Sequence, residues 1–189
     1  MDLLRPCRES DGAPVYEAVV ESLGTLTPWM AWCTAAYAPA DAEQWVRDTI
    51  AGRAAGTAFE FIITGRNGEL YGVCGLNGID AVNRRANLGY WVRSSAQRRG
   101  LATEAVRQLV RWAAVHTDLI RLEVVVAEEN TASLRVAQRA GAIVEGTLKS
   151  RLLVHGRAHD AVMHSFIRGV NMAADDAGSL RPPSTGDDT

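Results

Sequence analysis

Apolar and polar residues alternate with a period of two in the middle of the chain. Between positions 86 and 93, every second residue is apolar or aromatic: Ala86, Leu88, Tyr90 and Val92. Because successive side chains of a strand point to opposite faces of a sheet, this pattern predicts a half-buried strand. The following residues, 94–100, are mostly polar, so the strand is expected to end in a loop.

A helical period begins directly after that loop. Small and apolar residues recur on one face, at Ala102, Ala105, Val106, Leu109, Val110 and Ala113. This stripe predicts an amphipathic helix. Two earlier helices are predicted, one over Asp11–Ser22 and one that ends near residues 52–56. For the second, Asp41 is expected to be the N-cap and Gln44 to complete a capping box.

Other apolar runs predict further strands: Leu3–Arg8, Ala58–Arg66, Leu70–Asn77, Leu122–Ala127, Ile143–Leu153 and Ala158–Ile167. Asn67 and Gly68 favour a tight hairpin turn between the second and third of these. Asn130 and Gly141 are expected to cap the two ends of one more helix. Strands interleaved with helices indicate an α/β fold, with a mixed sheet and helices on both faces.

Length and composition fit one domain, predicted over residues 1–170, followed by a disordered polar tail over residues 171–189. The chain has 189 residues, of which 47% are hydrophobic and 22% are charged. No apolar run approaches the ~20 residues of a membrane helix, and the N-terminus lacks a signal-peptide pattern. Cys7, Cys33 and Cys74 are far apart and are interpreted as reduced thiols of a cytoplasmic protein.

The loop between the central strand and its helix is the strongest candidate site. Gln97–Ala102 reads Q-x-x-G-x-A, with Arg98 and Arg99 inside it. Small residues let the backbone approach an anion, and the first amides of a helix have no partners within it. These features predict a pyrophosphate site, although an ordinary strand-to-helix turn fits the short pattern equally well. Neither a Walker loop nor a G-x-G-x-x-G fingerprint is present.

Charges and histidines narrow the choice of partners. The formal net charge is -2. Six arginines concentrate near the loop, at positions Arg93, Arg98, Arg99, Arg107, Arg111 and Arg121. They fit a polyphosphate ligand but are too few for a nucleic-acid surface, so no nucleic-acid partner is expected. The four histidines lack the spacing of a metal motif, so no metal site is predicted.

Several short motifs occur in a fixed order: Gly89–Val92, Gln97–Ala105, Arg121–Glu123, Asn130–Ser133, Ala140–Ala142 and Glu145–Lys149. Together they resemble the GNAT N-acetyltransferases, in particular the branch with the ribosomal-protein N-terminal alanine and serine acetyltransferases. The resemblance covers residues 3–168. It implies a GNAT-like fold whose mostly antiparallel central sheet splays open at the cofactor site. It also implies direct transfer of an acetyl group from acetyl-CoA to a primary amine.

The resemblance implies roles for particular residues. The main chain of Trp91 and Val92 would contact the pantetheine arm and the thioester carbonyl. The loop and first helical turn would bind the pyrophosphate, through Gln97, Arg98, Arg99, Gly100, Leu101, Ala102 and Thr103. Asn130 would bind the pantetheine amide, unless it is only an N-cap. The hydroxyl of Ser133 would protonate the departing thiolate.

The catalytic base is harder to predict. An ammonium group must lose a proton before its nitrogen can attack, and a carboxylate is the usual acceptor. Glu123 matches a glutamate of the family pattern and is the candidate base, although a salt bridge to Arg121 is equally expected. Glu60 and Asp160 are weaker candidates.

The acceptor is expected to be a small-molecule or peptide amine. A protein α-amine, a polyamine and an amino sugar all remain open. So do transfer of a longer acyl group and a non-catalytic acyl-CoA-binding regulator. Trp29 and Trp32 are interpreted as caps of the core rather than walls of an acceptor pocket. Ala142 stands where the branch usually has Phe, and the protein is expected to be a monomer or a homodimer.

Overall fold

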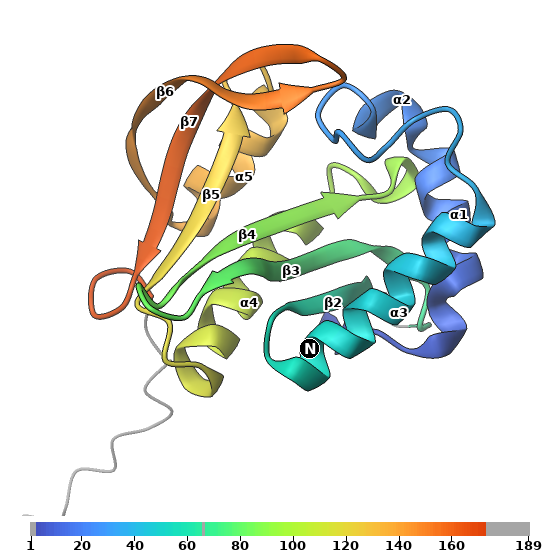
Figure 1. The fold of residues 1–189 in the computed structure, drawn as a ribbon, viewed down its shortest axis with the longest axis horizontal. Coiled ribbons are helices and arrows are strands. Elements are labelled where there is room, and N and C mark those ends of the chain that lie inside the picture. Colours follow the sequence, from blue (N-terminus) through green and yellow to red (C-terminus); the bar gives the residue numbers. More distant parts are fainter. Residues whose placement is uncertain (1–2, 66, 173–189) are drawn as a thin grey trace, which may run out of the picture.

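One mixed sheet of seven strands runs through the part of the chain that this computed structural model describes, residues 3–65 and 67–172. Its strand order is β1-β2-β3-β4-β5-β7-β6 (Figure 1). The strands are β1 (Leu4–Pro6), β2 (Phe59–Thr64), β3 (Leu70–Asp80), β4 (Arg85–Val92), β5 (Arg121–Ala127), β6 (Ile143–Val154) and β7 (Arg157–Ile167). The helices are α1 (Gly12–Glu21), α2 (Leu23–Leu26), α3 (Pro39–Ala55), α4 (Leu101–His116) and α5 (Thr131–Ala140), with 3-10 turns at Glu9–Asp11 and Ser94–Ala96.

The parallel neighbours β4 and β5 stay paired only at their beginnings. Arg85–Asn87 pairs with Arg121–Glu123, and every other neighbouring pair of strands is antiparallel. Beyond this point β4 continues to Val92, while β5 pairs with β7 along Arg121–Ala127. The sheet therefore opens into a V between β4 and β5 (Figure 1). The predicted α/β fold, with a mostly antiparallel and splayed sheet, is confirmed.

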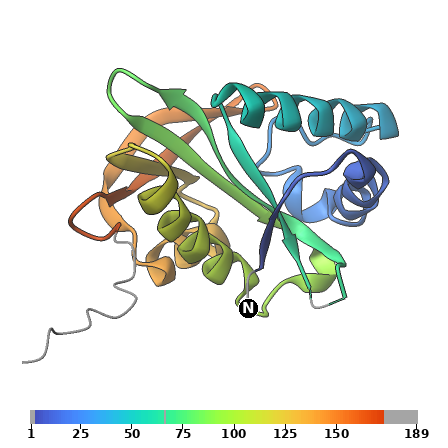
Figure 2. The same cartoon turned by 90° about the horizontal axis from the view of Figure 1, so that it is seen from below.

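Helices cover both faces of the sheet, with α4 and α5 on one face and α1 and α3 on the other (Figure 2). Because successive side chains of β4 point to opposite faces, this strand packs against the helices on both faces of the sheet. Ala86, Leu88 and Val92 belong to a buried cluster that includes Leu109 of α4. Trp91, which points the other way, packs against the cluster formed with α1 and α3. The strand that leads into residues 94–100, the predicted anion loop, is thus packed on both of its faces.

The start of α3 differs from the prediction. Its first residue is Pro39 and its N-cap is Ala38, so Asp41 lies in the first turn instead of capping it. The carboxylate of Asp41 accepts the backbone N–H of Ala38 at 2.8 Å, and Gln44 donates to Asp48. Proline is favoured at the first helical position because its fixed φ suits the helix and its missing N–H would have no partner there.

The predicted caps of α5 are confirmed. The side chain of Asn130 accepts the backbone N–H of Ser133 at 3.1 Å, and Gly141 ends α5 in the left-handed region. The predicted hairpin between β2 and β3 is also present, but its loop is longer than the predicted tight turn at Asn67 and Gly68. Its loop closes where the N–H of Gly65 donates to the carbonyl of Glu69 at 2.9 Å.

The packed domain extends slightly beyond the predicted boundary at residue 170. Met172 is 1% exposed, and the amide of Asn171 donates to the carbonyl of Gly141 at 2.8 Å. The remainder of the predicted tail, residues 173–189, lies outside the described residues. No helix among the described residues is long and apolar enough to cross a membrane.

Candidate active site

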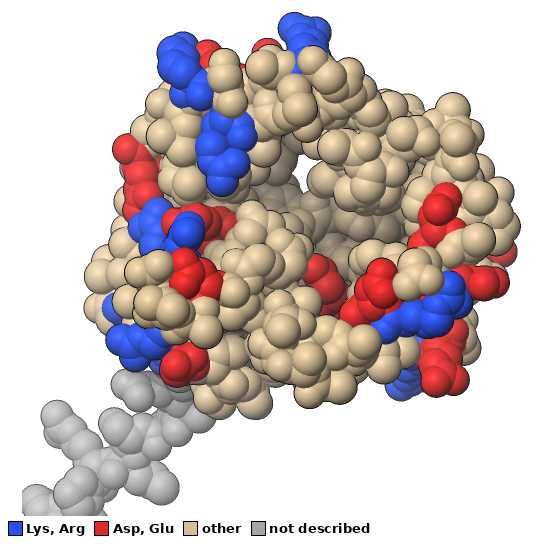
Figure 3. All heavy atoms as spheres, viewed as in Figure 1, with Lys and Arg blue, Asp and Glu red and all other residues tan. Residues whose placement is uncertain are grey.

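A groove of about 660 Å³ runs along the free edge of β4, between the loop before α4 and the start of α5. Figure 3 shows the molecule hollowed between the β6–β7 arm and the α1–α2 segment. Most predicted cofactor residues line the groove together: Trp91, Val92, Gln97, Arg98, Gly100, Leu101, Ala102, Thr103 and Asn130. Ser133 lines it too. The exception is Arg99, whose guanidinium donates to the carbonyl of Ser95 at 2.8 Å.

The backbone of the loop curls through two left-handed residues before α4 begins. Arg98 has a φ of 62° and Gly100 a φ of 75°. The first helical bond runs from the N–H of Glu104 to the carbonyl of Gly100 at 3.1 Å, so the earlier amides of α4 have no acceptor within the helix. The side chain of Gln97 donates to the carbonyl of Val92 at 3.4 Å. This bond ties the anion loop to the end of β4.

A hydroxyl pair crosses the opening of the sheet. The phenol of Tyr90 on β4 donates to the carbonyl of Ser133 at 3.0 Å, and its oxygen lies 2.9 Å from Ser133 Oγ. Burial raises the pKa of Tyr90, so the phenol stays protonated. The sequence pattern identified Tyr90 only as an apolar position of the strand. Its hydroxyl was the available signal, because a buried phenol O–H usually has a polar partner.

A second hollow, of about 700 Å³, lies on the α1–α3 side of the sheet. Aromatic and apolar side chains form most of its wall: Val15, Val19, Met30, Trp32, Tyr37, Trp45, Val73 and Trp91. Met30, Tyr90 and Trp91 line both hollows. The two spaces therefore meet at the free edge of β4.

The tryptophans before α3 form walls of these hollows and do not cap the core. Trp32 is 47% exposed, and its ring centroid lies 6.4 Å from that of Trp91 and 5.8 Å from that of Tyr37. Trp29 lines the groove along β4. The interpretation as core caps was wrong because core and pocket walls have the same apolar composition. The packing of α1 and α3 beneath this segment decides that these tryptophans line the hollows and do not cover the core.

Three polar side chains lie on the floor of the second hollow. The amide of Asn87 donates to Asn77 Oδ1 at 2.9 Å, and the amide of Asn77 donates to Glu60 Oε1 at 2.9 Å. Burial raises the pKa of Glu60, while the bond from Asn77 and the charge of Arg53 act in the opposite direction. Glu60 thus places a carboxylate in this hollow.

Glu123 lies elsewhere, at the junction of β4 and β5. Its carboxylate accepts from Arg121 at 2.8 Å and from Arg85 at 3.2 Å, and the residue lines neither hollow. The expected salt bridge to Arg121 is therefore present. Asp160 is similarly engaged on the β6–β7 hairpin, where it accepts from Lys149 at 2.7 Å.

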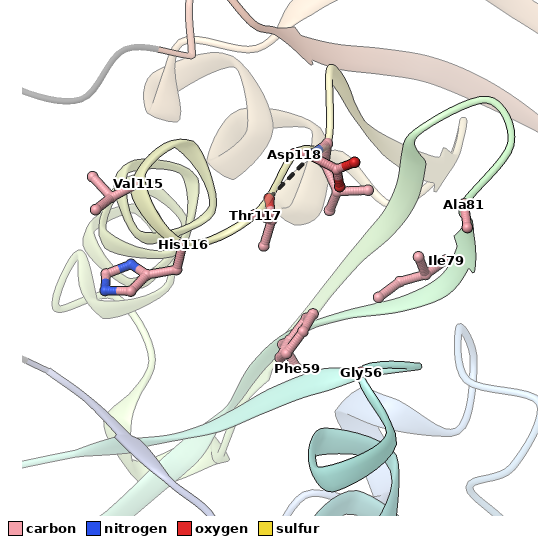
Figure 4. A pocket seen from close by; sticks show the side chains of 9 residues that line it. Gly56, Phe59, Ile79, Ala81, Val115, His116, Thr117 and Asp118 are labelled. Carbon is pink, nitrogen blue, oxygen red and sulfur yellow. Dashed lines mark hydrogen bonds between the residues drawn. The ribbon is translucent and has the colours of Figure 1, made fainter.

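A third hollow, of about 530 Å³, lies at the end of α4 and shares no lining residue with the other two (Figure 4). Phe59, Ile79 and His116 are among its walls. The ring of His116 stacks on Trp112, and its Nδ1 lies 2.9 Å from the carbonyl oxygen of that residue. Within the described part of the chain, no group of three His, Cys, Asp or Glu side chains gathers as metal ligands would.

Comparisons with known proteins agree with this geometry. The family model for the acetyltransferase (GNAT) domain matches residues 3–143. The chain is 27% identical over 164 residues to the ribosomal-protein-serine acetyltransferase of Escherichia coli K12, across 87% of this chain and 91% of that protein. It is 34% identical over 102 residues to the putative ribosomal N-acetyltransferase YdaF of Bacillus subtilis 168, but that match spans only 54% of this chain and 56% of the relative.

The fold is also similar to that of a solved enzyme. RimL, a ribosomal L7/L12 alpha-N-protein acetyltransferase solved with coenzyme A, superposes with a TM-score of 0.81 and 27% identity, over 87% of this chain and 92% of that one. The family model covers most of the chain, and the open strand, the helix-start loop and the splayed sheet are all present. The chain therefore belongs to the GNAT acetyltransferase family and is an acetyl-CoA-dependent N-acetyltransferase.

Proposed function

We propose that the acceptor is the α-amine at the N-terminus of a protein chain. The observation that carries this proposal is the meeting of the two hollows at Met30, Tyr90 and Trp91. An amine entering from the α1–α3 side would reach a thioester held along β4, which brings both reactants together at one point. Because the ring of Trp32 at the rim is exposed, the second hollow opens to solvent there. The rest of a polypeptide acceptor would lie outside this opening. RimL, which is named as an alpha-N-protein acetyltransferase, supports the same acceptor class.

The groove along β4 would hold the donor. Because β4 is unpaired beyond Asn87 on the side facing β5, the backbone of Trp91 and Val92 is available to bond the pantetheine arm as an added strand would. The amides from Arg98 to Thr103 would hold the pyrophosphate, with Gln97 fixing the loop. In this proposal Arg99 contributes only charge, since it lies outside the groove.

Ser133 would supply the proton for the departing thiolate. Its hydroxyl lines the groove and is held beside Tyr90, while Asn130 would bind the pantetheine amide and also caps α5. The proton that leaves Ser133 Oγ would be replaced by the second proton lost from the attacking nitrogen, with the Tyr90 phenol holding the hydroxyl in place. Glu123 has no role in this proposal, because two arginines already bind its carboxylate.

A small amine is the second candidate acceptor. The second hollow combines aromatic walls with the carboxylate of Glu60, an arrangement that also suits a compact organic cation. Transfer to spermidine or to an amino sugar, without transfer to a peptide α-amine, would favour this alternative.

The test is release of free coenzyme A from acetyl-CoA with a panel of amines. The panel contains peptides with a free N-terminus, the same peptides blocked at the N-terminus but carrying a lysine, spermidine and an amino sugar. We expect turnover with the free N-termini and none with the blocked peptides. Equal turnover with both forms would contradict the α-amine proposal. Binding of acetyl-CoA without turnover of any amine would favour the regulator.

We also propose a reducing, cytoplasmic location. Cys7, Cys33 and Cys74 are all free thiols, and the last two are buried. Proteins of oxidising compartments generally pair their cysteines. The measurement is fractionation of the native host, in which recovery in an oxidising compartment would contradict this location.

A further inference from the structure

A row of three residues crosses β2, β3 and β4 at the floor of the second hollow. Glu60 pairs with Gly75, and Gly75 pairs with Gly89. Paired residues of neighbouring antiparallel strands lie on the same face of a sheet, so all three face α1 and α3. Two of the three have no side chain. The row is therefore a trough with one carboxylate at its β2 end.

The carboxylate already extends over the first glycine. A Cβ added to Gly75 would lie only 1.8 Å from Glu60 Oε2, so any other residue here would displace the acid. At Gly89 an added Cβ would meet nothing closer than 3.8 Å. Neighbouring strands are about 4.8 Å apart, so the carboxylate lies about one strand spacing from Gly89. That space can hold an amine nitrogen or one water.

The other ionisable groups near Glu60 keep one charge state or are already bound. Glu60 is therefore the acid that can exchange protons in this hollow. Its ionisable neighbours are Arg53 and Asp41 on α3, Tyr37 before α3 and Cys74 on β3. Burial raises the pKa of Tyr37 to about 12 and also raises that of Cys74, so both stay neutral near pH 7. Arg53 stays cationic, and the carboxylate of Asp41 is bound to the start of its own helix.

We propose that Glu60 is the catalytic base of this acetyltransferase and that the acceptor enters as an ammonium ion lying over Gly89. The inference rests on the proposed transfer to an amine but not on which amine it is. Glu60 removes one proton from the ammonium, directly or through one water. The nitrogen lone pair then forms the C–N bond, and the C–S bond breaks with its electron pair on sulfur. Ser133 gives its proton to the sulfur, the second nitrogen proton restores the Ser133 hydroxyl, and the proton on Glu60 returns to solvent.

The first test replaces the carboxylate without changing its shape. Glu60→Gln keeps an acceptor for the bond from Asn77, so folding should be preserved. With whichever amine the panel shows to be the best acceptor, we expect kcat/KM near pH 7 to fall by roughly 10²- to 10⁴-fold. The Kd for acetyl-CoA, measured by calorimetry, should stay within about twofold. Glu43→Gln on the exposed side of α3 is the matched control and should leave both quantities unchanged.

The pH profile separates a base from a structural residue. In the parent protein kcat/KM should fall at acid pH as Glu60 becomes protonated, and Glu60→Gln should lack this limb. An unchanged limb would assign it to another group and overturn the proposal. So would activity of Glu60→Gln within threefold of the parent protein.

A second variant tests the trough itself. Gly89→Ala adds a methyl group where no atom lies closer than 3.8 Å, so the fold should survive while the space next to the carboxylate shrinks. We expect at least a tenfold loss of kcat/KM for the amine with acetyl-CoA binding retained. Full activity would show that the acceptor does not pass over Gly89. Failure of the α-amine proposal appears separately, as turnover of a different amine that still depends on Glu60.

Discussion

The phenol oxygen of Tyr90 lies 2.9 Å from the Oγ of Ser133, and this pair joins β4 to α5 across the opening of the sheet. The two residues are 43 positions apart in the chain. Each belongs to a different secondary-structure element, so the separation of the hydroxyls depends on how α5 packs against α4 and β5. A thiolate leaving from a donor along β4 would depart beside this pair.

Removing one hydroxyl of the pair should slow turnover more than it weakens donor binding. We expect Ser133→Ala to lower kcat by roughly 10²-fold with little change in the Kd for acetyl-CoA, because general-acid help is lost while the groove keeps its shape. Thiol release and calorimetry measure the two quantities. Thr131→Ala, at an exposed position of the same helix, is the control. An equal loss of turnover and of affinity would contradict the acid role.

The left-handed residue before α4 should matter for the donor. Gly100→Ala places a Cβ in a conformation with φ of 75°, where no atom crowds it but the backbone itself is strained by about 1–2 kcal/mol. We expect the Kd for acetyl-CoA to rise at least fivefold, because the first amides of α4 shift. Gly169→Ala has the same kind of strain at φ of 79°, remote from the groove. It should lose stability without losing affinity, and a similar loss of affinity would contradict the prediction.

The ion pair between Arg93 and Glu21, which holds the loop before α4 to α1, should make the stability of the fold depend on pH in the acid range. Arg93 above all, together with the backbone N–H of Ser95, lowers the pKa of Glu21 to about 2 from an ordinary value of 4.5. A lowered pKa stabilises the fold above the unfolded value, and that contribution is lost as pH falls from about 4.5 towards 2. Urea unfolding at several pH values should show a smaller decline for Glu21→Gln across this window. An unchanged decline would mean that the ion pair adds nothing to the stability of the fold, as is the case for many exposed ion pairs.

Truncating an aromatic side chain in the wall of the second hollow should weaken binding of the acceptor without changing binding of acetyl-CoA. Trp32 is 47% exposed, so Trp32→Ala should cost little stability while removing aromatic surface beside Trp91. We expect KM for the acceptor amine to rise about fivefold to tenfold, with the Kd for acetyl-CoA unchanged. Leu153→Ala, at a position 68% exposed on β6, is the control. A change in donor affinity would place Trp32 at the groove along β4 instead.

Local patterns in the sequence were enough for most elements and for the loop of the proposed donor site. The period-two strand, the loop with Gly100 and the amphipathic helix are contiguous, so their spacing alone placed the anion loop at a helix start. The cap at Asn130 and the end at Gly141 likewise depend on a few neighbouring residues. The start of α3 was misplaced, because Pro39 favours the first helical position more strongly than Asp41 favours the cap.

The tertiary structure alone decided the arrangement of the proposed acceptor side. Glu60 and Asn77 meet only because β2 pairs with β3 in one register, and the trough exists because that register aligns Gly75 with Gly89. The nearby Arg121 indicated a salt bridge for Glu123, but nothing local to Glu60 indicated that its carboxylate would face a hollow. Such outcomes depend on which side chains the fold brings together across strands. The sequence by itself therefore determined the loop at the helix start that we propose for the donor, and the packing of distant strands and helices determined which side chains lie opposite it.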